Sequence, residues 1–130
     1  QLRRLEDFTA RRIRNARFLN DSIKIKGIST PYQAKSVRHV YHQYVVRVED
    51  SFASSREKLM DYLQARGIGS AVHYPKAVYE QPLYRELGYT NESCPVSEDV
   101  SRRVMSLPVH PSLTEEDLQY IANTVNSFEA

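Results

Sequence analysis

The chain has 130 residues, of which 41% are hydrophobic and 26% charged, and its formal net charge is +2. This composition is that of a globular protein, and the single cysteine, Cys94, excludes a scaffold held by internal disulfides. No apolar stretch approaches the roughly 20 residues of a membrane helix, so the sequence predicts one cytoplasmic domain. The chain begins inside a helical pattern and without methionine, which predicts a fragment of a longer protein.

Charge is distributed unevenly along the chain. Residues 1–66 contain 14 Lys/Arg and 7 Asp/Glu, whereas residues 67–130 contain 4 and 9. Such asymmetry suits a nucleic-acid face, a contact with another domain or an anionic small molecule. The basic half lacks the interleaved aromatic residues on which single-stranded nucleic acid stacks, so nucleic acid is not predicted as a partner.

Two elements are predicted in the first fifty residues. A stripe of apolar residues at helical spacing, with arginines on the other faces, predicts a helix that ends near Asn20; the stripe is Leu2, Leu5, Phe8, Ile13, Ala16 and Leu19. A connector with Gly27 and Pro31 follows. Residues 39–48, HVYHQYVVRV, then alternate as a strand does. His42 falls on the apolar face of this strand, which predicts a hydrogen-bonded histidine in the core.

The rest of the chain predicts two further strands and three further helices. A capping box from Ser54 to Glu57 opens a helix that Gly67 ends, and a short strand covers residues 70–74. A helix capped by Ser97 places Val96, Val100 and Val104 on one face, and a strand follows at 105–109. Thr114 and Asp117 begin the last helix, which buries Leu118, Ile121, Ala122, Val125 and Phe128. Three short strands covered by helices make a small α/β sandwich, with the first and last helices bracing one face.

The four histidines do not predict a metal site. His39 and His42 are three residues apart on a predicted strand, so they point to opposite faces. Neither a cysteine pair nor an HExxH pattern is present to support zinc. The sequence also lacks a nucleophile elbow, a phosphate loop and a GxGxxG motif.

The stretch SAVHYP, residues 70–75, predicts a candidate binding site. Pro75 keeps the preceding residue extended and ends the strand, so His73 and Tyr74 should project from a strand end to opposite sides. An imidazole and a phenol can hydrogen-bond a hydroxyl-rich or anionic ligand. The alternative is a tyrosine-rich turn that packs against the first helix.

GIGSAVHYP (67–75) and SLPVHPSLT (106–114) occur in that order after QLRRLEDFTARRIRNARFLND and HVYHQYVVRV. Together these segments closely resemble the C-terminal portion of the DegT/DnrJ/StrS family of pyridoxal-phosphate sugar aminotransferases of fold type I. The resemblance covers almost the whole chain. It implies an α/β (α+β-like) small domain with a three-stranded, mainly antiparallel sheet covered by helices. Residues 1–22 would be an interdomain helix and residues 23–130 the small C-terminal domain.

The resemblance also implies a function. Such enzymes use pyridoxal phosphate to transfer an amino group from glutamate to a nucleotide-linked keto sugar, and they form homodimers. The lysine that binds the cofactor lies upstream, in a large domain, and none of Lys24, Lys26, Lys35, Lys58 and Lys76 matches it. This chain alone should therefore contain no catalytic or cofactor-binding residue and should be inactive.

The resemblance implies substrate contacts as well. His73 and Tyr74 match positions near the sugar end of the substrate, where they would orient it by hydrogen bonding. Tyr79 stands where the family commonly has a histidine. Tyr79 and His42 are secondary candidates for substrate binding. The alternative function is a free-standing ligand-binding or regulatory module that reuses this fold.

Overall fold

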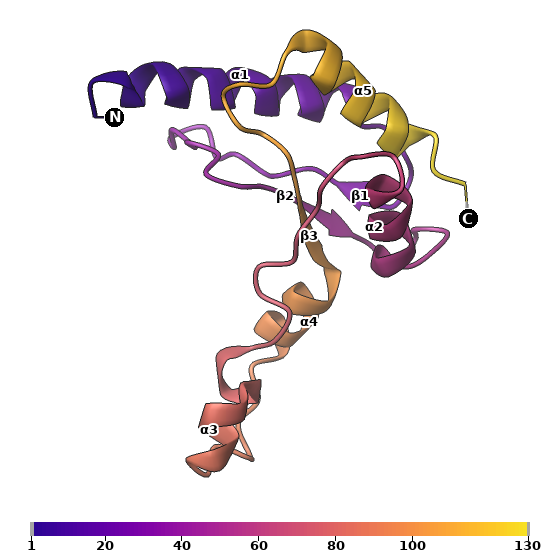
Figure 1. Ribbon diagram of the computed structural model, residues 1–130. Coiled ribbons are helices and arrows are strands. Elements are labelled where there is room, and N and C mark those ends of the chain that lie inside the picture. The colour runs from indigo at the N-terminus through magenta and orange to yellow at the C-terminus, as the bar shows by residue number, and fades with distance from the viewer. Residues whose placement is uncertain (1, 130) are drawn as a thin grey trace.

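The computed structural model describes residues 2–129. Gln1 of the predicted interdomain helix (1–22) and Ala130 of the predicted small domain (23–130) lie outside the described residues. The chain forms a body from which an arm projects (Figure 1). The body contains η1 (Leu2–Arg4), α1 (Leu5–Ser22), α2 (Arg56–Gln64), α5 (Glu115–Asn126) and a sheet. The arm contains η2 (Val78–Glu80), α3 (Pro82–Glu86) and α4 (Pro95–Arg103), of which η2 and α3 were not predicted.

The sheet has three antiparallel strands in the order β1-β2-β3, namely Ile28–Ser29, Tyr44–Val48 and Val104–Leu107. The predicted fold class is therefore confirmed, but one predicted strand is wrong. Residues 70–74 contribute only Ala71, which pairs with Ser106. The third strand comes instead from Ile28–Ser29, and two residues are too short to show any alternation in the sequence.

The strand predicted at 39–48 begins five residues late. Tyr41 has a positive φ of 46°, and its N–H bonds to the ring of His39, so the chain cannot continue as a strand there. Tyr44, Val46 and Val48 are buried as the alternation predicts. His42 is exposed, so its prediction as a core histidine is wrong.

Two helix starts differ from the prediction. In α2 the capping residue is Ser55, one residue after Ser54, and its hydroxyl accepts from the Lys58 N–H at 3.2 Å. In α4 the first residue is Pro95, whose fixed φ and missing N–H suit the first helical position, so Ser97 is not a cap. Val96, the residue after this proline, is 77% exposed.

The first and last helices lie side by side over one face of the sheet, as predicted (Figure 1). Ala16 and Leu19 of α1 are fully buried there. The opposite end of α1, together with η1 before it, extends beyond the body, which leaves Leu2 of η1 86% and Leu5 of α1 52% exposed. Only the second half of the predicted apolar stripe therefore faces the core.

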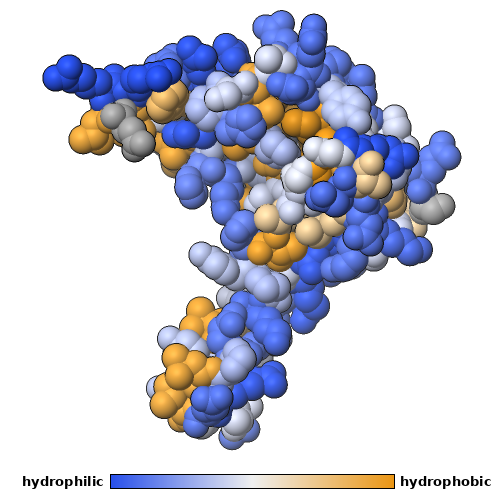
Figure 2. Space-filling view, in the orientation of Figure 1, coloured by the Kyte–Doolittle hydropathy of each residue, from blue (hydrophilic) through white to orange (hydrophobic). Residues whose placement is uncertain are grey.

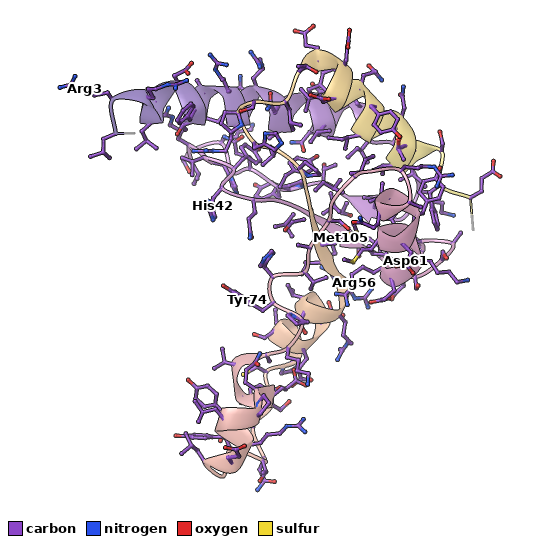
Figure 3. All side chains as sticks on the ribbon, in the orientation of Figure 1. Arg3, His42, Arg56, Asp61, Tyr74 and Met105 are labelled. Atoms are coloured by element: carbon purple, nitrogen blue, oxygen red, sulfur yellow. The ribbon has the colours of Figure 1, made fainter. Side chains whose placement is uncertain are left out.

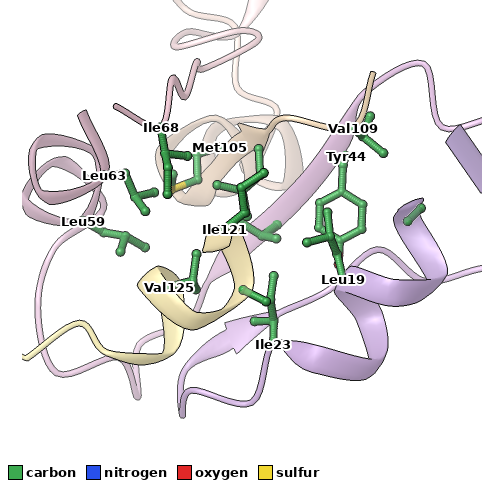
Figure 4. Close-up of a cluster of buried hydrophobic side chains, with 14 of the residues drawn as sticks. Leu19, Ile23, Tyr44, Leu59, Leu63, Ile68, Met105, Val109, Ile121 and Val125 are labelled. Atoms are coloured by element: carbon green, nitrogen blue, oxygen red, sulfur yellow. The ribbon is translucent and has the colours of Figure 1, made fainter. Parts of the chain in front are cut away.

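The hydrophobic core lies between the sheet and the helices α1, α2 and α5 (Figure 4). Leu19, Leu63, Met105 and Val125 meet in this cluster and have 1% or less of their surface exposed. Tyr44 is also fully buried, and its hydroxyl donates to Asn20 Oδ1 at 2.7 Å, which satisfies its polar atom. Burial raises the pKa of this phenol well above its ordinary value.

Three arginines hold the helix α4 to the body, and one of them, Arg47 of β2, donates to Asp99 Oδ2 at 2.8 Å. Arg56 of α2 donates to the carbonyl oxygens of Ser101 and Val104, at 2.7 and 3.3 Å, where α4 passes into β3. Arg103 pairs with both carboxylate oxygens of Asp50 at 2.6 and 3.0 Å, which holds the pKa of Asp50 below its usual value. The α4–β3 segment is thereby fixed at the root of the arm.

Candidate functional site

The candidate site is an exposed turn, residues 73–76, which we call the His73 turn. Upstream, Ala71 forms two backbone hydrogen bonds with Ser106 of β3, at 2.8 and 3.3 Å. Downstream, Ala77 is buried and its N–H donates to Glu80 Oε2 at 2.8 Å. All four residues of the turn itself, 73–76, are exposed. The turn therefore presents its side chains from a segment that is tied down at both ends.

His73 and Tyr74 lie together instead of on opposite sides. Their rings meet edge to face, with centroids 5.9 Å apart and planes inclined by 86°, and the peptide bond between them is cis. Tyr74 is 74% exposed. The prediction of opposite projection is wrong, because the chain has left the sheet before His73 and strand alternation no longer applies. The two rings can instead hydrogen-bond one ligand.

A shallow depression of about 240 Å³ lies beside the turn. Its lining comes from two stretches of chain. One runs from the turn to the start of η2 and contributes His73, Tyr74, Lys76, Ala77 and Val78. The other is α4 with the start of β3, which contribute Ser97, Val100, Ser101 and Val104. The turn thus packs against α4, and not against α1 as the alternative reading of the sequence had it. An apolar floor with a rim of hydroxyl, phenol, imidazole and ammonium groups is suited to orienting a hydroxylated ligand.

The wall formed by α4 was missed by the sequence interpretation. Ser97, Val100 and Ser101 are spaced three and four residues apart, so they share one face of a helix. The sequence instead predicts Ser97 as a helix cap and places Val100 on one face with Val96 and Val104. The signal in the sequence is Pro95: a helix that begins at this proline includes Ser97, Val100 and Ser101 on one face.

Tyr79 is separate from this depression. Its hydroxyl donates to Glu98 Oε1 and accepts from the Cys94 N–H at 3.3 Å. The hydrogen bond to Glu98 raises the pKa of the Tyr79 phenol and lowers the pKa of the Glu98 carboxyl. Tyr79 and Glu98 line a different hollow, with residues of α3 and the loop that follows it. The structure therefore does not bring Tyr79 together with His73 and Tyr74.

His42 is also separate. It is exposed in the loop before β2 and does not line the depression. Figure 2 shows a hollow between the body and the arm. Figure 3 places His42 on the body side of this hollow and Tyr74 on the arm side. The two side chains could meet only across a ligand or partner that fills the hollow.

The lysines of this chain do not fit a Schiff-base site. All five, namely Lys24, Lys26, Lys35, Lys58 and Lys76, are exposed, whereas a lysine that attacks a cofactor is activated by desolvation or a neighbouring cation. Within residues 2–129, acidic, histidine and cysteine side chains do not gather into a group that could hold a metal ion. Nor does any helix in that range have the length and apolar character needed to cross a membrane.

An antiparallel three-stranded sheet braced by helices makes this chain a small α/β domain. Residues 1–126 match the DegT/DnrJ/EryC1/StrS aminotransferase family. The chain belongs to this family.

Several known proteins are similar to the chain. It is 34% identical over 101 residues to a pleiotropic regulatory protein of Geobacillus stearothermophilus, a match that covers 78% of the chain and 26% of that protein. It is 32% identical over 124 residues to the dTDP-3-amino-3,6-dideoxy-alpha-D-galactopyranose transaminase of Aneurinibacillus thermoaerophilus, covering 95% and 32%.

Solved structures have the same fold. The crystal structure of S. venezuelae DesV superposes with a TM-score of 0.83 at 31% identity, over 96% of this chain and 33% of that one. The chain thus spans about a quarter to a third of the length of the relatives it matches.

Proposed function

We propose that this chain is the small domain of a pyridoxal-phosphate-dependent aminotransferase that transfers an amino group from glutamate to a nucleotide-linked keto sugar. Residues 23–130 would form the small domain and residues 1–22 the interdomain helix. The observation that carries the proposal is the exposed His73–Tyr74 pair over α4 in a chain of this aminotransferase family. The similarity to a dTDP-sugar transaminase supports a sugar nucleotide as the substrate class.

His73 and Tyr74 would bind and orient the sugar. A phenol and an imidazole both donate and accept hydrogen bonds, so the pair can hold neighbouring hydroxyl groups of one ring. The adjacent rings are 5.9 Å apart, which is close enough to contact the same sugar. Neither residue is assigned a proton transfer at the reacting carbon. Their contribution is positioning, which converts a loosely bound substrate into an aligned one.

The cofactor would be held outside this chain. Pyridoxal phosphate supplies the electron sink for amino transfer, and it needs a lysine to carry it. Because the five lysines here are exposed surface residues, we assign the cofactor to a large domain that the relatives' greater length accommodates. No step of the reaction is therefore routed through a residue of this chain.

The proposal extends to assembly and location. Leu2 of η1 and Leu5 at the start of α1 are exposed apolar residues, and we infer that they contact the large domain or the second subunit of a homodimer. We also propose that the protein is cytoplasmic, because its exposed free cysteine, Cys94, suits a reducing compartment.

The two half-reactions test the proposal in the full-length protein. We expect His73→Ala and Tyr74→Phe to raise KM for the nucleotide sugar about tenfold, because each removes a hydrogen bond to a sugar hydroxyl. The half-reaction with glutamate should change by less than about twofold, since the proposal places both residues against the sugar and not against the amino donor. The half-reactions are followed by the absorbance of the cofactor.

Tyr32→Phe is the matched control, because Tyr32 is 86% exposed and no hydrogen bond of its hydroxyl is found within residues 2–129. It should leave both half-reactions unchanged. Equal losses in both half-reactions of the His73 and Tyr74 variants would contradict a sugar-side role. A glutamate-responsive absorbance from residues 1–130 alone would contradict the assignment of the cofactor to a large domain.

A second candidate function is a ligand-binding or regulatory module without catalysis. The observation that favours it is the similarity to a protein named as a pleiotropic regulator. The two candidates differ in one measurement: turnover of glutamate by the full-length protein supports the enzyme, whereas binding of a sugar nucleotide without turnover supports the module.

A further inference from the structure

We propose that Tyr79 and Glu98 form a clamp that holds the His73 turn against α4, so that Tyr79 is a positioning residue and not a substrate ligand. Only the expected effect on the KM for the nucleotide sugar rests on the proposed function. The clamp itself rests on contacts within this chain.

The clamp is a network centred on one carboxylate oxygen. Glu98 Oε1 accepts from the Tyr79 hydroxyl, from the Cys94 N–H at 3.0 Å and from Ser93 Oγ at 3.3 Å. The Tyr79 oxygen in turn accepts from the same Cys94 N–H at 3.3 Å. Hydrogen bonds to an ionised carboxylate are about twice as strong as those between neutral groups. Tyr79 is thereby bound to the start of α4 by the strongest type of bond available to a phenol.

The Tyr79 hydroxyl already makes hydrogen bonds within the network, both as donor and as acceptor. A phenol donates once, and its one hydrogen is given to Glu98. Its oxygen already accepts from Cys94. A sugar hydroxyl would therefore have to displace the carboxylate in order to receive a bond from Tyr79. This argues against direct substrate binding by Tyr79.

The clamp completes a loop that is tied to one rigid segment at both ends. Ala71, two residues before the turn, pairs with Ser106 of β3. Tyr79, three residues after it, bonds to Glu98 of α4. Because α4 runs directly into β3, both ties belong to one continuous stretch of chain. Arg56 fixes that stretch to the body.

The clamp is needed because few other contacts restrain this part of the chain. Ala77 is the one buried residue between Gly69 and Val100. If Tyr79 were released, η2 would be held mainly through Ala77, and the His73 turn would gain conformational freedom. His73 and Tyr74 would then have to be ordered when the substrate binds, which weakens binding.

Variants of the full-length protein test the clamp by two independent readouts. Tyr79→Phe and Glu98→Ala should each raise amide hydrogen exchange at Ala77, Glu80 and Gln81, whose N–H groups are hydrogen-bonded, about tenfold, because each opens the same network. Glu98→Gln keeps an acceptor oxygen but loses its charge, so its effect should lie between wild type and Glu98→Ala. The double variant Tyr79→Phe/Glu98→Ala should exceed the larger single effect only slightly, since both changes break one network.

The catalytic readout is the KM for the nucleotide sugar. Tyr79→Phe and Glu98→Ala should raise it by a similar factor of about three to ten, with the half-reaction with glutamate unchanged. Tyr89→Phe is the matched control: it removes a hydroxyl from the same hollow, and no hydrogen bond of that hydroxyl is found in the described part of the chain. It should change neither readout.

Two results would overturn the clamp. One is a higher KM for Tyr79→Phe with normal exchange and a silent Glu98→Ala, which would make Tyr79 a direct ligand. The other is unchanged exchange in all three single variants. If the protein has no aminotransferase activity, the exchange measurement still decides whether the clamp exists, so this proposal and the proposed function can fail separately.

Discussion

At the residue scale, two glycines show how differently the same left-handed conformation can be constrained. Gly27 has φ +85° and a Cβ added there would lie 2.4 Å from the Cα of Phe52. Gly67 has φ +76°, yet a Cβ there would meet nothing within 4 Å. Gly67 therefore serves only as the helix end, whereas Gly27 also allows two stretches of backbone to approach closely.

Replacing each glycine with alanine should separate these two roles. Gly67→Ala should lower the free energy of unfolding by about 1–2 kcal/mol, the strain of a left-handed alanine. Gly27→Ala should lower it by about 2–5 kcal/mol, because backbone atoms of Phe52 must also move. Urea unfolding of the two variants measures the difference. Equal losses would contradict the close approach at Gly27.

At the element scale, α5 shows how a helix start is set by local chemistry. The Thr114 hydroxyl accepts from the Asp117 N–H at 3.1 Å, and Asp117 Oδ2 accepts from the Thr114 N–H and hydroxyl, both at 2.8 Å. These bonds from Thr114 hold the pKa of Asp117 below its usual value of 3.8. Because the charged carboxylate is favoured in the folded state, its stabilisation is present above about pH 4 and is lost as the pH falls further.

Thr114→Ala should lower the free energy of unfolding by about 1 kcal/mol at pH 7, the usual effect of removing a capping side chain. The difference from wild type should narrow as the pH falls below about 4, where protonation of Asp117 weakens the same network in the wild type. Unfolding curves at a series of pH values measure this. A difference that does not change with pH would show that Asp117 takes no part in the cap.

At the scale of the whole molecule, the body and the arm differ in how they are stabilised. The body contains the buried cluster between the sheet and α1, α2 and α5. In the arm, α3 has no buried residue and α4 buries only Ser101. The arm therefore keeps its place through hydrogen bonds and ion pairs at its root, and it lacks a core of its own.

Native-state hydrogen exchange should divide the chain accordingly. Amides of α3 should exchange at least about a hundredfold faster than those of β2, since local opening is easiest where few apolar contacts are broken. Arg56→Ala should speed exchange in α4, because it removes the bonds to Ser101 and Val104. Arg102→Ala, which removes an exposed arginine of α4 itself, is the control. Equal protection in α3 and β2 would show that the arm has an additional source of stability.

Much of the body could be predicted from the sequence, because its elements bury one regular face. The helix from Thr114 and the buried Tyr44, Val46 and Val48 follow from periodicity and capping. The arm could not be predicted in the same way, since exposed elements leave no periodic pattern. His73 and Tyr74 could be identified because Pro75 ends the predicted strand beside them and because they match the family's positions. The residues of α4 that line the same depression follow from neither argument.

The family, the helices of the body and the exposed polar turn can all be read from the amino-acid sequence, because they depend on local patterns and on matching segments. Which residues meet follows from the folded chain alone. It separated Tyr79 and His42 from the His73 turn, joined Tyr79 to Glu98, and made Ile28–Ser29 a strand in place of residues 70–74. These pairings link residues far apart in the chain, so their energies appear only once the backbone has folded.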